Sequence, residues 1–210
     1  SGDFSLSNSD LAQISAGSLT IGSATNGTIT VDGVTSTSTP LTLIATASGS
    51  AVNFSSTPSF SDLTVDAGTG GVVFGGSTTS SGNLSVTSGG AITDTGTLTI
   101  TGTSSFTTDV DDRAITLDNT SNVFTGAVSL NTSGTSGNAT LTSNNAVTLS
   151  TSTVGGDLAV TVGGDNSLNV TGAGSAGGFI SLLADDDIIF TASGDVATTT
   201  GNITVTADND

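Results

Sequence analysis

The stretch from Ser81 to Gly102, SGNLSVTSGGAITDTGTLTITG, sets the pattern for the whole chain. It contains two short apolar–polar–apolar triplets, Leu84–Val86 and Leu98–Ile100, which are separated by turns rich in Gly, Asn and Asp. In an extended backbone successive side chains point to opposite faces, so the outer residues of each triplet share one face and the middle residue lies on the other. We therefore predict that each repeat of this unit forms part of one coil of a parallel β-solenoid.

The same triplet recurs along the chain at intervals of roughly 8 to 12 residues, as expected for short strands separated by turns. The further triplets are Phe4–Leu6, Leu19–Ile21, Ile29–Val31, Leu41–Leu43, Val52–Phe54, Leu63–Val65, Val72–Phe74, Ile115–Leu117, Val128–Leu130, Ala139–Leu141, Val147–Leu149, Leu158–Val160, Leu168–Val170, Ile180–Leu182, Ile188–Phe190 and Ile203–Val205. Single apolar residues in the wider gaps, such as Ile92, Phe106 and Val196, indicate minor strands or corners. Two triplets and a corner give a coil of about 20 to 23 residues, so we expect about nine or ten coils.

Internal similarity supports this prediction. Gly82–Thr87 (GNLSVT) recurs as Gly156–Thr161 (GDLAVT) and as Gly201–Thr206 (GNITVT). The alternative fold is a pair of Ig-like β-sandwiches, which also have short, regularly spaced strands and about 100 residues per domain. The chain shows no self-similarity at half its length, has no Trp or Tyr, and has strands of mostly three residues. These features favour the solenoid.

The composition excludes several classes of protein. All eighteen acidic residues are Asp, Arg113 is the single cation, and the formal net charge is −17. Nucleic acids and anionic membranes attract clustered Lys or Arg, so neither is an expected partner. No apolar run approaches the length of about 20 residues that spans a bilayer. The absence of Cys excludes a disulfide scaffold and thiol chemistry. Without Lys, Glu or Met, little in the sequence favours helix.

Both ends of the chain lie within the repeating pattern and show no polar or helical cap. Repeat arrays need caps to protect their terminal ladders. We therefore expect residues 1–210 to form a single solenoid segment of a longer repeat protein, with open ends. The expected partners are flanking repeats of the same chain or copies of the chain stacked head to tail into a fibre.

Two longer stretches carry a resemblance to a known family. They are Leu11–Gly22 (LAQISAGSLTIG) and the region from Val123–Leu130 (VFTGAVSL) to Val154–Val160 (VGGDLAV). Both resemble repeats of large filamentous-haemagglutinin-type exoproteins, and the resemblance covers most of the chain. It implies a right-handed parallel β-helix that serves as the shaft of a bacterial surface adhesin, exported by two-partner secretion. The N-terminal secretion domain, the Asn-Pro-Asn-Gly motif, an Arg-Gly-Asp tripeptide and a basic glycan-binding surface are absent, so an adhesive site is not implied.

Little in the sequence points to catalysis. Some parallel β-helices cleave pectins, and paired carboxylates can hydrolyse glycosides. The strongest acidic cluster here is Asp185–Asp187, in a stretch without Arg, Lys, His or aromatic residues other than Phe190 to hold a sugar. We interpret it as a solvated turn between two coils and expect no enzyme activity. Ice binding through Thr side chains is disfavoured as well, because the alternating Thr residues at 97–103 do not recur on every coil.

Calcium binding is the remaining chemical hypothesis. Ca²⁺ takes several oxygen ligands, which clustered carboxylates can supply. The candidate ligands form two clusters, Asp109, Asp111 and Asp112 in one and Asp185, Asp186 and Asp187 in the other. Arg113 is expected to pair with one of the first cluster in a bulged loop. No other cofactor is indicated, and solvated Asp residues in turns are the simpler interpretation.

From the pattern and the resemblance together, we predict a non-enzymatic rod segment of a secreted or cell-surface bacterial adhesin or extracellular fibre. A surface module that binds a ligand or Ca²⁺, with a host or cell-surface partner, is the alternative. A polysaccharide-active β-helix and an ice-binding solenoid rank below both.

Overall fold

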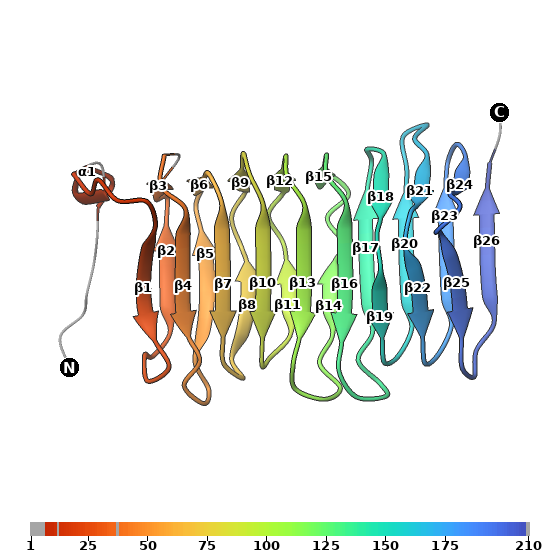
Figure 1. The fold of residues 1–210 in the computed structure, drawn as a ribbon, viewed down its shortest axis with the longest axis horizontal. Coiled ribbons are helices and arrows are strands. Elements are labelled where there is room, and N and C mark those ends of the chain that lie inside the picture. Colours follow the sequence, from red (N-terminus) through yellow and green to blue (C-terminus); the bar gives the residue numbers. More distant parts are fainter. Residues whose placement is uncertain (1–6, 12, 37, 209–210) are drawn as a thin grey trace.

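The computed structural model describes residues 7–11, 13–36 and 38–208, and these form the predicted all-β solenoid (Figure 1). Its 26 strands stack side by side along one axis, and every pair of neighbouring strands is parallel, as in the register Leu41↔Leu63. The only helix among the described residues is the short α1 (Asn8–Leu11). That helix is too short to cross a membrane, and no other described segment is a helix long enough to do so. The parallel pairing of all neighbouring strands excludes the alternative of two Ig-like β-sandwiches, whose sheets are antiparallel.

The first five coils each contribute strands to three sheets, called A, B and C. Sheet B, the most regular, has nine strands, one per coil. They are β2 (Ile29–Asp32), β5 (Ala51–Ser55), β8 (Gly71–Phe74), β11 (Ile92–Asp94), β14 (Ile115–Leu117), β17 (Ala139–Ser143), β20 (Leu158–Val162), β23 (Ile180–Ala184) and β26 (Ile203–Ala207). The nine strands confirm the expected number of coils.

Sheet A contains the strand that opens each coil. In the first six coils these are β1 (Leu19–Ser23), β4 (Leu41–Ala45), β7 (Leu63–Ala67), β10 (Leu84–Ser88), β13 (Ser104–Thr108) and β16 (Val128–Thr132). Sheet C contains the short third strands β3 (Thr35–Ser36), β6 (Ser59–Phe60), β9 (Thr78–Ser80), β12 (Leu98–Ile100) and β15 (Val123–Phe124).

Sheets A and C merge into one sheet beyond β16. That strand pairs through Val128 with Leu149 of one later strand and through Asn131 with Thr153 of the next. Sheet A therefore also holds β18 (Val147–Leu149), β19 (Ser152–Val154), β21 (Leu168–Val170), β22 (Ala173–Ala176), β24 (Ile188–Phe190) and β25 (Asp195–Thr198). In these last coils the third strand runs on into the first strand of the next coil within one sheet.

Strand register measures the length of a coil. Equivalent positions of adjacent coils are also joined by side-chain hydrogen bonds, which give the step along the sequence directly. The step is 19 between Asn138 and Asp157 and 24 between Leu98 and its register neighbour Asn122. These two steps lie just outside the predicted 20 to 23 residues, but most steps in sheet B lie within it, such as 20 from Val52 to Val72 and 23 from Ile92 to Ile115. The predicted coil length is therefore confirmed for most coils, and insertions in the turns account for the longer ones.

The core runs along the axis as columns of inward side chains. Alternation within each strand buries every second residue, as in β4, where Leu41, Leu43 and Ala45 are at most 2 % exposed. Phe54 and Phe74 occupy matched positions in adjacent coils, and their rings stack with centroids 4.8 Å apart and planes 11° apart. Stacked like residues therefore link these two coils, as expected for a repeat array in which each coil packs on its neighbour.

Two details differ from the sequence-based expectation. Most coils have three strands rather than two, because short Ser- and Thr-rich segments such as Thr78–Ser80 and Ser152–Val154 also pair. These segments lack apolar doublets, so hydrophobic alternation does not reveal them. The acidic turn 185–187 joins β23 to β24 within one coil rather than linking two coils. The expected strand Phe4–Leu6 lies outside the described residues.

The N-terminal end is also not fully open. Asn8 of α1 accepts a hydrogen bond from the backbone N–H of Thr35 at 2.7 Å and donates one to the carbonyl oxygen of Gly33 at 3.2 Å. Thr35 opens β3 and Gly33 lies just before it, at the free edge of sheet C. The expectation of an uncapped N-terminus is therefore wrong at this sheet. A single helical turn is too short to give a recognisable helix signal in the sequence.

Candidate functional site

The candidate Ca²⁺ ligands 109–112 lie on an exposed lateral loop between β13 and β14. Asp112 adopts a left-handed backbone conformation with φ of 62°. Its Oδ1 accepts hydrogen bonds from the backbone N–H groups of Thr135 and Ser136, at 2.9 and 2.8 Å, on the loop of the next coil. Asp112 therefore holds two neighbouring loops together, which is a structural task.

The second candidate cluster, in the turn between β23 and β24, is arranged in the same way. Asp185 Oδ2 accepts the backbone N–H of Gly164 at 2.8 Å, and Asp186 Oδ2 accepts the hydroxyl of Ser167 at 2.7 Å. Both donors belong to the preceding coil. Asp187, like Asp109 and Asp111 in the first cluster, is exposed. Within residues 7–11, 13–36 and 38–208, no three acidic side chains come close enough together to hold a metal ion.

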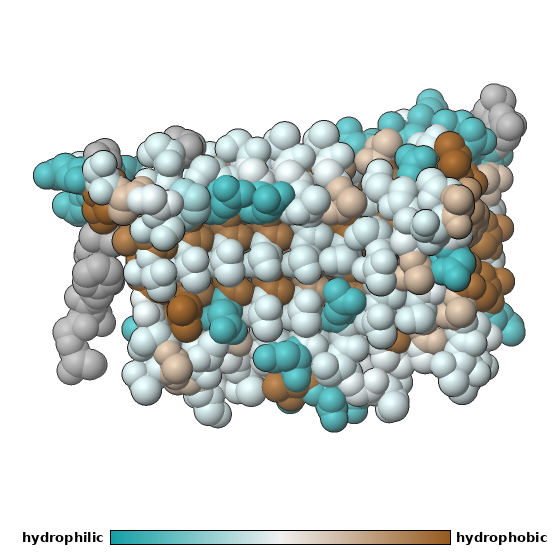
Figure 2. All heavy atoms as spheres, in the orientation of Figure 1, coloured by the Kyte–Doolittle hydropathy of each residue, from teal (hydrophilic) through white to brown (hydrophobic). Residues whose placement is uncertain are grey.

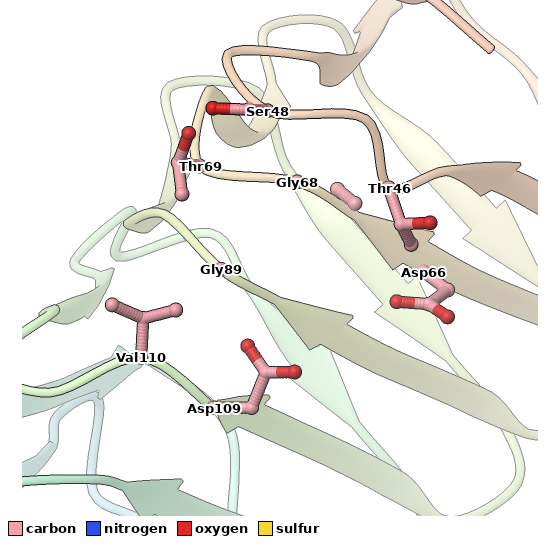
Figure 3. Close-up of a pocket in the computed structure, with 9 residues that line it drawn as sticks. Thr46, Ser48, Asp66, Gly68, Thr69, Gly89, Asp109 and Val110 are labelled. Carbon is pink, nitrogen blue, oxygen red and sulfur yellow. The ribbon is translucent and has the colours of Figure 1, made fainter. Parts of the chain in front are cut away.

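Two aspartates that are distant in the sequence, Asp66 and Asp109, both line a lateral groove (Figure 3). It encloses about 260 Å³ beside the ends of four successive sheet A strands, β4, β7, β10 and β13. Its lining comprises Thr46, Ser48, Asp66, Ala67, Gly68, Thr69, Gly89, Asp109 and Val110. Partial burial, followed by the nearby charge of Asp109, raises the pKa of Asp66 above the ordinary value for aspartate. The groove thus combines a negative potential with several hydroxyl groups, which suits a cation better than an anion.

The sequence did not single out Asp66. Asp66 is the fourth residue of β7 and faces outward between apolar residues, as alternation predicts. Its proximity to Asp109 depends on the register of sheet A over two coils, in which Asp66 pairs with Thr87 and Thr87 pairs with Thr107. Such a register cannot be read from spacing when coil lengths vary.

A second group of polar residues lies inside the solenoid. Asp94, at 4 % exposure, and Asn122, at 0 %, face one another in the core. Asn122 donates from Nδ2 to Asp94 Oδ2 at 2.6 Å, and its Oδ1 accepts the N–H of Leu98 at 2.8 Å. Asp94 Oδ1 accepts the N–H of Asp118 at 3.0 Å. The pair fixes the inserted loop 118–122 against β11 and β12, as buried polar groups require partners.

Side-chain bonds between coils recur at the position just before a strand. Asp62 Oδ1 accepts the N–H of Asn83 at 2.7 Å, and Asn83 Oδ1 accepts the N–H of Thr103 at 2.9 Å. On sheet B, Asn138 Oδ1 accepts the N–H of Asp157 at 2.8 Å, and Asp157 Oδ1 accepts the N–H of Phe179 at 2.7 Å. In each case the side chain of one coil accepts the backbone N–H of the following coil. The Asn and Asp residues of the repeated GNLSVT-like motif are thus part of the stacking mechanism.

The C-terminal end of the rod is apolar (Figure 2). Of the eight large hydrophobic residues that are exposed among the described residues, six lie in the last two coils. They are Phe179, Leu183, Ile189, Phe190, Ile203 and Val205. All five residues of β26 are exposed, although the same strand position is buried on alternate residues in the coils before it. Nothing in the described chain covers this end.

Comparison with known proteins points to a family of repeats. A family model described as "Repeats of unknown function (DUF5649)" matches residues 60–131, about a third of the chain. No curated protein and no solved structure matches the chain. The matched region covers β6 to β16 and includes the stretch 81–102, whose triplets define the repeat. Over these residues the chain is similar to a family of repeats, and its fold is a β-solenoid, consistent with a structural repeat module.

Proposed function

We propose that this chain is a non-enzymatic structural segment of a secreted or surface-exposed bacterial adhesin or extracellular fibre. Its task is mechanical: it forms a rigid rod that spaces or links other parts of the protein. The observation that supports this most strongly is the unbroken register of sheet B, whose nine strands pair in sequence from β2 to β26. A rod held by continuous parallel ladders and a shared axial core transmits force without a hinge.

The lateral surface supports the same role. Three of the six potential ligands in the acidic loops, Asp112, Asp185 and Asp186, are engaged in hydrogen bonds between coils. The two similarities, to a family of repeats and to the exoprotein repeats described above, agree with a module used in series. Localisation outside the cell is inferred from this resemblance and from the Thr- and Asn-rich, Cys-free composition.

Small-angle X-ray scattering of the purified chain tests the rod. Nine coils at about 4.8 Å per strand give a stack of roughly 40 Å, and flanking repeats should lengthen it in proportion. A scattering profile of a longer fragment that grows in length at constant cross-section is the expected result. A profile showing independently moving globular units would contradict the proposal.

The surface location and the absence of enzyme activity need separate tests. Antibodies against the chain should label intact cells of the producing organism, and labelling only after permeabilisation would contradict an extracellular role. Incubation with pectins and other acidic polysaccharides should release no new reducing ends. Sustained release by the purified chain would instead support a polysaccharide-active β-helix.

The groove of Asp66 and Asp109 favours one alternative, a surface module that binds a cation. A positive ion bound in the groove would reduce the repulsion between the two carboxylates, which contributes to the raised pKa of Asp66. Thermal unfolding with and without Ca²⁺ distinguishes the cation-binding module from the purely mechanical rod, because a ligand that binds only the folded chain raises its melting temperature. A rise that is abolished by Asp66→Asn would support the alternative, and an unchanged melting temperature would support the purely mechanical role.

A further inference from the structure

We propose that Asn26 is a site of spontaneous deamidation, at which the chain converts its own asparagine into aspartate and isoaspartate and so loosens the contact between the first coil and the second. Asn26 is the only Asn that is followed directly by Gly in the sequence. It lies in the turn that joins β1 to β2. The modification is separate from the mechanical role proposed above and adds a chemical property to one turn of the rod.

The reaction needs only Asn26, Gly27 and water. The backbone nitrogen of Gly27 attacks the side-chain carbonyl carbon of Asn26 and forms a new C–N bond. The C–N bond of the side-chain amide then breaks, and ammonia leaves with the proton that the Gly27 nitrogen has lost. Water opens the resulting five-membered imide at either carbonyl, which gives an ordinary aspartate or an isoaspartate whose backbone is one methylene longer. Glycine favours the attack because it has no side chain to hinder its nitrogen and because its backbone is the most flexible.

The local structure leaves the reacting groups free. The turn 24–28 lies outside the ladders and is closed by one backbone hydrogen bond, from the N–H of Asn26 to the carbonyl oxygen of Ser23 at 3.0 Å. Gly27 is exposed, and a Cβ built on it would meet no atom within 4 Å. Asn26 Nδ2 donates to the carbonyl oxygen of Gly27 at 2.9 Å, so the side chain lies along the residue that must attack it. Among the described residues, no group accepts the N–H of Gly27.

The asparagines that precede strands are held differently. Asn83 is followed by Leu84, whose N–H donates to a carbonyl oxygen of the next coil at 2.9 Å. Asn138 is followed by Ala139, whose N–H donates to a carbonyl oxygen of the next coil at 2.8 Å. The side-chain oxygen of each Asn also accepts an N–H of the next coil. Attack at Asn83 or Asn138 would therefore break bonds between coils, whereas attack at Asn26 breaks no bond of the Gly27 nitrogen.

The turn also binds the second coil. The hydroxyl of Ser50 donates to the carbonyl oxygen of Asn26 at 3.1 Å, and the N–H of Ala51 donates to Thr28 Oγ1 at 3.2 Å. Isoaspartate inserts a methylene between these two acceptors, so both cannot keep their positions. Either product also adds a carboxylate to a chain whose formal net charge is already −17. We therefore expect the two bonds to weaken, while the ladders farther along the rod stay intact.

Incubation of the purified chain in mildly alkaline buffer, followed by peptide mass spectrometry, tests the reaction, because base assists the attack by the backbone nitrogen. We expect Asn26 to be converted at least about 10-fold faster than Asn83 or Asn138. Gly27→Ala should slow the conversion by about 10-fold or more without disturbing the fold, since the site has room for a Cβ. Gly17→Ala is the matched control, because a Cβ there also meets nothing within 4 Å. It should leave the rate at Asn26 unchanged.

The loosening is measured on the deamidated chain, which anion exchange separates from the parent by its added charge. The amide of Ala51 should exchange with deuterium about 10-fold faster than in the parent, and that of Ile92, in β11, should exchange at the same rate. Four results would each overturn the proposal: conversion at Asn26 no faster than at Asn83, a Gly27→Ala variant that is converted like the parent, conversion of Asn26 only in urea, or unchanged exchange at Ala51. None of them alters the scattering profile of the rod, so the proposed function would stand.

Discussion

Asp94 is the register partner of Phe74 in the parallel ladder of sheet B. Both residues are buried, so a carboxyl group occupies the inward position next to that of an aromatic side chain. Burial raises the pKa of Asp94 above its ordinary value, although the hydrogen bonds from Asn122 and from the backbone at Asn119 and Asp118 act in the opposite direction. This one residue gives the core a dependence on pH.

The sign of that dependence follows from proton binding. Because the folded chain keeps a proton on Asp94 to a higher pH than the unfolded chain does, its free energy of unfolding should fall as pH rises above about 4, the ordinary aspartate pKa. The loss continues until the raised folded pKa is passed, with a slope of at most about 1.4 kcal/mol per pH unit for one group. Urea unfolding at a series of pH values measures it.

Asp94→Asn should flatten this pH dependence, since it removes the buried titrating group. Asp187→Asn, which alters an exposed carboxylate, serves as the control and should leave the slope in place. Equal slopes for the parent and Asp94→Asn would show that another group is responsible, with Asp66 the next candidate because its pKa is raised as well.

Gly102→Ala should strongly destabilise the rod. A Cβ at Gly102 would lie 2.5 Å from the carbonyl carbon of Gly82 in the preceding coil and 2.5 Å from Asn83 Oδ1, which are contacts that real Cβ atoms do not make. The backbone of Gly82 or Gly102 would have to shift at a position where the two coils are in contact. We therefore expect the free energy of unfolding to fall by about 2–4 kcal/mol.

Gly27→Ala is the matched substitution, because a Cβ there meets nothing within 4 Å. It should be neutral or stabilising by up to about 1 kcal/mol through the unfolded chain. Urea denaturation of both variants gives the comparison. Equal effects of the two substitutions would mean that the close approach of coils at Gly102 is not rigid.

Phe74→Ala should cost about 3–5 kcal/mol, because the ring is fully buried and stacks on Phe54. Phe179→Ala removes the same atoms from a side chain that is 56 % exposed and should cost no more than about 1 kcal/mol in the monomer. Melting curves at low protein concentration distinguish the two. A large loss of stability for Phe179→Ala, with little loss for Phe74→Ala, would contradict the interpretation that the stack of Phe54 and Phe74 stabilises the rod.

Ser104→Ala should stabilise the chain by about 1 kcal/mol, because an unpaired buried hydroxyl costs about 1–3 kcal/mol. Ser104 is 2 % exposed in a column that holds Leu84 and Val128 on either side, and its hydroxyl has no hydrogen-bond partner among the described residues. Alanine removes that hydroxyl while leaving almost no cavity.

The opposite result is expected at Ser143, where the hydroxyl donates to the carbonyl oxygen of Asn122 at 2.7 Å and accepts the N–H of Asn145 at 3.0 Å. Ser143→Ala should therefore destabilise by about 1–2 kcal/mol. Differential scanning calorimetry of the pair would contradict the interpretation if both substitutions moved the melting temperature in the same direction.

The sequence alone determined the architecture. Every apolar triplet within the described residues lies in a strand, because an inward side chain at every second residue is a local property of the backbone that spacing makes visible. Repetition of such triplets at about 20 residues already requires stacking, since one coil has too little core to fold by itself.

Only the tertiary structure decided which polar residues meet. Coil lengths vary along the chain, so the register that brings Asp66 near Asp109 is not contained in any local pattern. The inward carboxylate of Asp94 is tolerated because Asn122, from an inserted loop, reaches it in the core. The N-terminal cap depends on Asn8 reaching across to β3, far along the chain. Local alternation specifies which face a residue occupies, whereas contacts between coils depend on the summed lengths of the turns between them.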